Sequence, residues 1–395
     1  MGADVSIIGR IDAIAQAAGR TSVELARETG IDATALSKVR GGQRSLKPAE
    51  VVAIAKALHV SPLALLDPES LSARLPAAAR AASHDRAVAP TSDAWQRIQA
   101  LVELHDVLAR QGITNRSNFT SDNGGSRKSI AAARAAAIEV GAGLDVEPGE
   151  RRFERLVDAI EAKLAVDVLV ERHEADALAG AAVPAPEFPF IFVNADQSRA
   201  RALFTLAHEL GHIIGDHSGL FADRKHLDSS SPEERFANAF AAELLIPLDV
   251  VSVALDKSRV PAEVLSGLML ELGVSFESLI YRLHTTGCIK DDGRDRLLAL
   301  GHRWLLGEVD SETKARLLVQ RDSRPERHVP SQLASRMHDG YERGVISARP
   351  LAGLLGVDLD EFLAANEIGE QVTVPEVGCP AKIATPDDLF GVPAA

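Results

Sequence analysis

The stretch FTLAHELGHIIGDH, residues 204–217, decides how the central part of this chain folds and what it can bind. Apolar residues recur along it at helical spacing, which predicts an amphipathic helix with a buried apolar stripe. His208 and His212 are four residues apart, a rotation of about 400°, so both imidazoles leave one face of that helix about one turn apart. Two ligands of a single tetrahedral metal ion need this arrangement.

Glu209 follows the first of these histidines directly. In that position its carboxylate can reach a metal-bound water rather than the metal itself. A five-residue pattern with two histidines also arises by chance. The alternative interpretation is therefore an ordinary helix that carries two solvent-facing histidines.

A second stretch, PEERFANAFAAELLIP, strengthens the prediction of a metal site. Glu234 and Asn238 share one helical face at a spacing of four. We expect Glu234 to complete the set of two histidines and one glutamate that is typical of catalytic zinc centres. Asn238 is expected to orient a ligand imidazole through a hydrogen bond.

Two other glutamates of that stretch compete for the ligand role. Glu233 lies about 100° from the face that Glu234 and Asn238 share, and Glu243 lies about 180° around the helix from Glu234. The helix geometry favours Glu234 and predicts a structural or cleft-edge role for Glu243.

Residues 7–66 predict a separate helical unit. One helix stops at Gly30, which provides the left-handed conformation of a helix C-terminus, and another begins at Ala33. A gap of about three or four residues between two helices is typical of a helix-turn-helix. Positive charge gathers on the second helix and its exit loop. The residues expected to face a DNA duplex are Thr34, Ser37, Lys38, Arg40, Arg44 and Lys47.

Composition narrows the function classes. The 395-residue chain carries a formal net charge of −13, so DNA binding has to come from a local basic patch. Cys288 and Cys379 are too few for a disulfide framework or a thiolate zinc site. The sequence has no apolar run of about 18 residues and no signal-peptide pattern, so we expect a cytoplasmic protein without a membrane span.

Two parts of the chain resemble known families. ELARETGIDATALSKVRGGQRS, with AKALHVSPLALL behind it, resembles the XRE (Cro/repressor-like) helix-turn-helix family. This resemblance implies DNA binding, with a docking or dimerisation role as the alternative. FTLAHELGHIIGDH, followed by EERFANAFAAELLIP and preceded by FPFIFVN, resembles the ImmA/IrrE family of zinc metallopeptidases.

The second resemblance implies a small gluzincin-like domain of bacterial or phage origin that cleaves a repressor protein. It assigns one zinc ion per chain to His208, His212 and Glu234, and the catalytic base to Glu209. Here the helix-turn-helix precedes the peptidase on the same chain. The target is therefore either a separate repressor or the chain's own DNA-binding module.

The predicted fold class is mainly α with a small β-sheet (α+β). Two β-like runs, 165–171 and 188–194, supply the sheet, and the second is expected to offer an edge to an extended substrate. We expect four parts: a helix-turn-helix domain at 1–70, a linker at 71–92, a metallopeptidase domain at 93–290 and a helical C-terminal region of unknown role at 291–395.

Two functions are consistent with these features. The first is a transcriptional regulator that binds a double-stranded DNA operator as a homodimer and cleaves a repressor or antitoxin-like protein. The second is a non-catalytic regulator or antitoxin of a toxin–antitoxin-like operon, whose metal domain senses or docks. The presence of Glu209 favours the cleaving regulator, because a domain that had lost its activity could lose this residue without cost to folding. Candidates for an additional oxyanion donor are His217, Tyr281 and His284, which the sequence does not rank.

Overall fold

The structure is a computed structural model of the chain. It describes residues 7–17, 20–41, 43–58, 60–67, 70, 93–114, 129–174, 178–217, 221–224, 231–254 and 260–371. The predicted linker at 71–92 lies outside the described residues. By compactness the chain divides into two units, Met1–Val345 and Ile346–Ala395.

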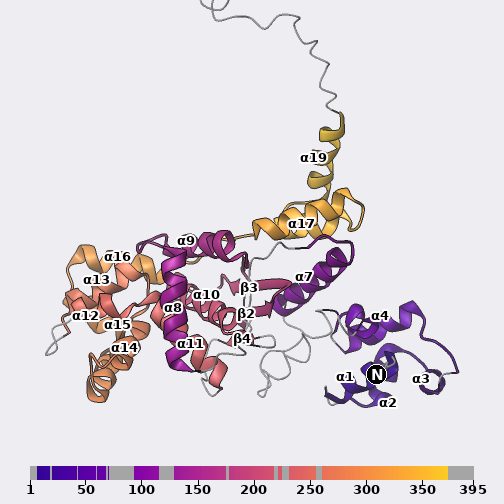
Figure 1. Ribbon diagram of the computed structural model, residues 1–395, viewed down its shortest axis with the longest axis horizontal. Coiled ribbons are helices and arrows are strands. Elements are labelled where there is room, and N and C mark those ends of the chain that lie inside the picture. Colours follow the sequence, from indigo (N-terminus) through magenta and orange to yellow (C-terminus); the bar gives the residue numbers. More distant parts are fainter. Residues whose placement is uncertain are drawn as a thin grey trace, which may run out of the picture. The chain divides into compact units, whose positions relative to one another are not determined.

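The N-terminal part is a helical bundle (Figure 1). Its described helices are α1 (Ile7–Ala17), α2 (Ser22–Thr29), α3 (Ala33–Arg40), α4 (Pro48–Ala57) and α5 (Pro62–Leu66). Helix α2 ends at Gly30, which is left-handed at φ 67°, as the sequence predicts. Helix α3 begins behind Asp32, whose carboxylate accepts the first free N–H groups of that helix. The bundle closes around an apolar core that includes Leu25, Leu36, Ile54 and Leu65.

A four-stranded sheet lies at the centre of the next part, in the order β1-β3-β2-β4. The strands are β1 (Asp167–Glu171), β2 (Leu178–Ala185), β3 (Phe188–Asn194) and β4 (Phe221–Arg224). β1 runs parallel to β3, whereas β2 is antiparallel to both of its neighbours. The prediction that 188–194 offers an open edge is wrong, because β3 is a central strand that is buried along its whole length.

Helices surround this sheet. Those that precede the last strand are α7 (Asp93–Arg110), α8 (Ile130–Leu144), α9 (Arg152–Ala159) with the π-helix η1 (Ile160–Leu164), and α10 (Arg199–Ile214). Those that follow it are α11 (Pro232–Leu245), α12 (Leu248–Ala254), α13 (Ala262–Leu272) and α14 (Phe276–Thr285). Helix α10 packs against β2 and β3 and against α11, and α11 packs in turn against α8 (Figure 1).

Glycines and caps divide the helical stretches after α12. Helix α13 ends at Gly273, which is left-handed at φ 69°, and Ser275 caps the start of α14. Helix α15 (Asp291–Glu308) is kinked at Gly301, and Asp310 caps the start of α16 (Ser311–Asp322).

The chain then returns to the sheet. His328 forms a two-bond antiparallel bridge with Val170 on the outer side of β1, with N–O distances of 3.0 Å in both directions. Helix α17 (Ser331–Glu342) follows and contacts both β1 and α7. Its Arg336 pairs with the buried carboxylate of Asp167 on β1.

The second compact unit contains α18 (Ala348–Leu355) and α19 (Leu359–Gln371), which are separated at the left-handed Gly356. The mainly helical structure with one small sheet confirms the predicted α+β class. Within the described ranges, no single helix is long and apolar enough to cross a membrane. Helices α13 and α14 reach that length and apolarity only as a pair, and they are bent by 107°.

Candidate metal centre

Helix α10 brings the two histidines of the FTLAHELGHIIGDH stretch together. His208 and His212 are both 0% exposed, and their Nε2 atoms lie 3.1 Å apart. Solvent-facing histidines on an ordinary helix would not be buried in this way. The structure therefore places two imidazole nitrogens side by side inside the protein.

Helix α11 supplies the carboxylate. Glu234 Oε2 lies 3.3 Å from His208 Nε2, and its Oε1 lies 3.5 Å from His212 Nε2. Gly211 lets α11 approach this closely, because a Cβ at that position would stand only 3.0 Å from the Cα of Ala237. The spacing of the helices is thus part of the construction of the site.

The ligand atoms of these three residues all lie within 4.8 Å of one another. In a tetrahedral site with bonds of about 2.0–2.1 Å, ligand atoms are separated by about 3.4 Å. The distances of 3.1, 3.3 and 3.5 Å lie close to that value. Two imidazoles and one carboxylate with this spacing fit a divalent metal ion.

Each of the two histidines contacts a second polar side chain through its Nδ1 atom. Asn238 Oδ1 lies 3.1 Å from His208 Nδ1, which is the contact proposed for this asparagine from the sequence. An amide oxygen only accepts, so His208 carries its proton on Nδ1 and keeps a lone pair on Nε2. His217 occupies the equivalent place behind His212, at an Nδ1–Nδ1 distance of 3.0 Å.

Burial keeps His212 neutral. It holds the pKa of His212 well below the usual value of 6.5, and the neighbouring His208 and His217 act in the same direction. A neutral imidazole is the form that binds a metal ion.

The side chain of Glu209 lies between α10 and strand β2, and it is fully buried. Gly180 on β2 makes room for it. A Cβ at Gly180 would lie 2.3 Å from Thr205 Cγ2 and 3.1 Å from Glu209 Oε1. Nothing in the sequence pattern around Gly180 marks this glycine as a residue of the site.

Glu243 lies in a buried ion pair. Its Oε2 is 2.6 Å from the guanidinium of Arg282, whose Nε also donates to the carbonyl of Ile246 at 2.8 Å. This placement agrees with the structural role expected for Glu243 from its position on the helix.

The three candidate oxyanion donors lie in different surroundings. His217 is behind His212, on the Nδ1 side rather than the Nε2 side. His284 lies 2.9 Å from Asp291 on α15 and 3.3 Å from Arg294. Tyr281, on the same helix as His284, is 54% exposed.

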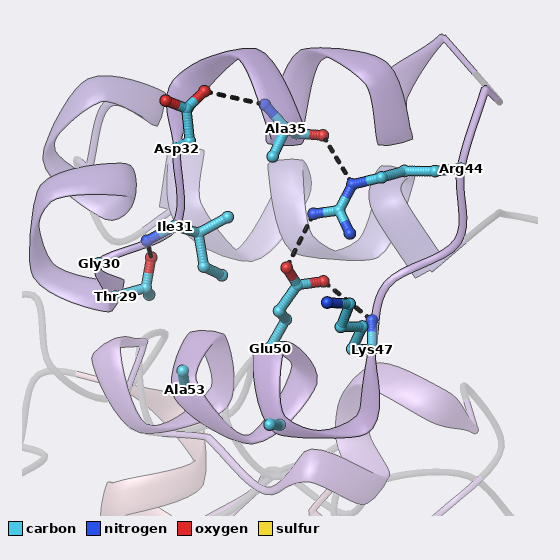
Figure 2. A pocket seen from close by; sticks show the side chains of 10 residues that line it. Thr29, Gly30, Ile31, Asp32, Ala35, Arg44, Lys47, Glu50 and Ala53 are labelled. Carbon is cyan, nitrogen blue, oxygen red and sulfur yellow. Dashed lines mark hydrogen bonds and ion pairs between the residues drawn. The ribbon is translucent and has the colours of Figure 1, made fainter.

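The predicted DNA-facing residues fall into two groups. Thr34, Ser37, Lys38 and Lys47 are exposed, and the side chain of Arg40 lies outside the described part of the chain. Arg44 is half-buried and spans from α3 to α4, as Figure 2 shows. It donates to the Ala35 carbonyl at 3.4 Å and to Glu50 at 2.8 Å, so it links the exit loop to the bundle.

Comparison with protein families agrees with both parts of the structure. Residues 11–65 match the helix-turn-helix family, and residues 162–284 match the peptidase family of IrrE N-terminal-like domains. No curated protein matches the chain. The two family matches confirm both resemblances: the chain joins a region similar to XRE-type helix-turn-helix domains, residues 11–65, to a region similar to IrrE/ImmA-like peptidase-family domains, residues 162–284.

Proposed function

We propose that the chain is a DNA-binding regulator whose peptidase-family domain holds one zinc ion and cleaves a repressor or antitoxin-like protein. The observation that carries this proposal is the convergence of the ligand atoms of His208, His212 and Glu234, with the buried Glu209 next to His208 on the same helix. The helix-turn-helix on the same chain supports a regulatory role rather than general proteolysis.

Each residue of the site has a separate role in peptide hydrolysis. Zinc held by His208, His212 and Glu234 would supply Lewis acidity and an acidified water. Glu209 serves as the proton acceptor and returns the proton to the departing amine. Asn238 keeps the ring of His208 in its ligating orientation through the Nδ1 hydrogen bond.

The sheet supports an extended substrate. β4 is the edge strand next to β2, and β2 carries Gly180 beside Glu209. An extended protein segment that adds to β4 as a further strand would lie next to β4, one strand away from β2, which faces the proposed base. In this proposal the edge of β4 replaces the edge expected at 188–194.

Substitution of two neighbouring glutamates tests the proposed metal centre. Glu234→Gln is expected to reduce the zinc content of the purified protein from about one per chain to near zero, because it removes a charged ligand. Glu233→Gln is the matched control and is expected to keep its zinc. Elemental analysis of folded protein provides the measurement, and His208→Ala provides the zinc-free reference. Stoichiometric zinc in folded Glu234→Gln would show that the third ligand is another residue.

The cleavage itself requires the partner. We expect the zinc-loaded protein to cut the repressor-like product of a neighbouring gene at one site, as detected by mass spectrometry of the fragments. A zinc-loaded protein that leaves that partner and its own helix-turn-helix intact would favour the second function, a regulator or antitoxin whose metal domain senses or docks.

The DNA-binding proposal rests on the exposed cluster of the helix-turn-helix. We expect a homodimer to bind an inverted repeat with half-sites about one helical turn apart. Lys47→Ala should weaken binding to all sequences and lower the salt slope by about one, because it removes a phosphate contact. Lys38→Ala, on the second helix of the pair, should instead alter which bases are preferred.

Fluorescence anisotropy with full-length protein gives the affinity for each sequence and the salt slope. Between about 50 and 200 mM salt, a protein with several phosphate contacts loses about 10³- to 10⁵-fold in affinity. Lys56→Ala, an exposed lysine in the last turn of α4, is the matched control. Absence of binding to promoter DNA at low salt would assign the helix-turn-helix a docking role.

A further inference from the structure

We propose that His217 is a positioning residue of the metal centre, which accepts a hydrogen bond from His212 and fixes the direction of the His212 Nε2 lone pair. This inference rests on the proposed zinc centre. It replaces the oxyanion role considered for His217, because the imidazole of this residue lies behind the ligand and not in front of it.

The end of α10 brings His217 to this place. The N–H of His217 donates to the carbonyl of His212 at 3.2 Å, and the N–H of Asp216 donates to the carbonyl of Ile213 at 3.1 Å. Asp216 is left-handed at φ 50°. These features define a Schellman motif, in which the chain folds back over the last helical turn. The residue after the left-handed position therefore meets His212.

The ring of His217 is tightly packed on all sides that the structure describes. It is 0% exposed and packs edge-on against Phe236, with ring centroids 5.1 Å apart. Gly215 lies directly against the ring, since a Cβ there would lie 2.4 Å from His217 Nε2. The ring can occupy this position only because residue 215 has no side chain.

The chemistry sets the direction of the hydrogen bond. Two imidazoles that meet through Nδ1 atoms 3.0 Å apart need one donor and one acceptor. The Nε2 of His212 faces His208 and Glu234, so the proton of His212 resides on Nδ1 and is donated. His217 accepts it and carries its own proton on Nε2.

Metal-ligating histidines usually donate their second N–H to a carboxylate, a carbonyl or water, and loss of that partner costs about 10- to 100-fold in metal affinity. Here Asn238 is the acceptor for His208, and the neutral imidazole of His217 is the acceptor for His212. The two contacts hold both ligand rings through Nδ1, while the Nε2 atom of each ring faces Glu234.

The test compares three variants of the full-length chain. His217→Phe keeps an aromatic ring but has no acceptor, whereas His217→Asn places an oxygen near the position of Nδ1. Gly215→Ala removes no polar group but displaces the His217 ring. His338→Phe, on the exposed face of α17, is the matched control for the loss of a histidine. The readouts are the zinc dissociation constant, by competition with a chromogenic chelator, and the unfolding temperature of the zinc-free protein.

We expect His217→Phe and Gly215→Ala to bind zinc about 10- to 100-fold more weakly than wild type, with His217→Asn recovering most of the loss. The zinc-free variants should still unfold cooperatively, so that the loss of zinc affinity is measured on folded protein. Wild-type zinc affinity in folded His217→Phe, or in folded Gly215→Ala should the phenylalanine variant fail to fold, would overturn the proposal. Equal losses in the phenylalanine and asparagine variants would also overturn it, because packing alone would then explain the effect. If wild type and His208→Ala bind zinc equally poorly, the zinc centre itself is refuted.

Discussion

Glu209→Gln is expected to keep a full complement of zinc and to lose cleavage of the protein partner by about 10²- to 10⁴-fold, the range that a general acid–base group supplies. Glutamine has nearly the same shape as glutamate, so it fits between α10 and Gly180. It cannot accept a proton, and Glu209 is not among the three residues whose ligand atoms converge. Fragment yield over time and zinc content should be measured on the same sample.

Glu233→Gln serves again as the control, because it changes the same functional group on the neighbouring helix. Cleavage by Glu209→Gln at the wild-type rate would refute the proposed proton transfer. Loss of zinc together with activity would instead place Glu209 among the ligands.

Arg336→Met is expected to destabilise the protein by about 3–5 kcal/mol, the usual cost of removing one partner of a buried ion pair. Arg336 pairs with Asp167, and both side chains are largely buried at the contact between α17 and β1. The guanidinium also lies 6.0 Å from the centre of the Phe188 ring. The free energy of unfolding in urea is the measurement.

Arg343→Met is the matched control, since Arg343, the C-cap residue of the same helix, forms an exposed pair with Asp339 at 2.6 Å. Exposed pairs contribute about 0–1 kcal/mol. Similar losses in the two variants would contradict the assignment of a special role to the buried pair.

The pH dependence of Arg336→Met has a definite sign. Burial raises the pKa of Asp167, and Arg336 acts in the opposite direction. A carboxyl with a higher pKa in the folded state binds its proton more readily there, so its contribution to stability is largest at low pH and decreases as the pH rises through the folded pKa. Loss of Arg336 raises that pKa further. The destabilisation should therefore be smallest near the unfolded pKa of about 4 and should grow toward neutral pH.

The sequence was most informative where periodicity and caps agree. The helix expected in the FTLAHELGHIIGDH stretch belongs to α10, and the strand expected at 188–194 is β3 with the same bounds. β2 was missed because its sequence, LAGAAVPA, consists largely of small residues without alternation, and the strand is buried on both faces. Glycine is unfavourable inside a strand, so Gly180 argues against a strand in the sequence, although in the structure it accommodates Glu209.

The role of His217 was hidden for a different reason. Five residues beyond His212, it would not share a helical face with that ligand if the helix continued. Only the Schellman motif brings the two rings together, and the signal for it was the Gly215–Asp216 pair after the second histidine. The break at Gly273 had a similar signal, a glycine followed by the capping Ser275.

The bridge between His328 and Val170 has a consequence for self-association. It occupies backbone groups on the outer side of β1, and α17 contacts the same strand. The sheet is therefore shielded on this side, while β4 forms its other edge. A chain truncated before His328 would present β1 and β4 as two unprotected edges on opposite sides of one sheet. Such a molecule can pair head to tail with its neighbours without ever closing a ring, which is the geometry of fibre growth.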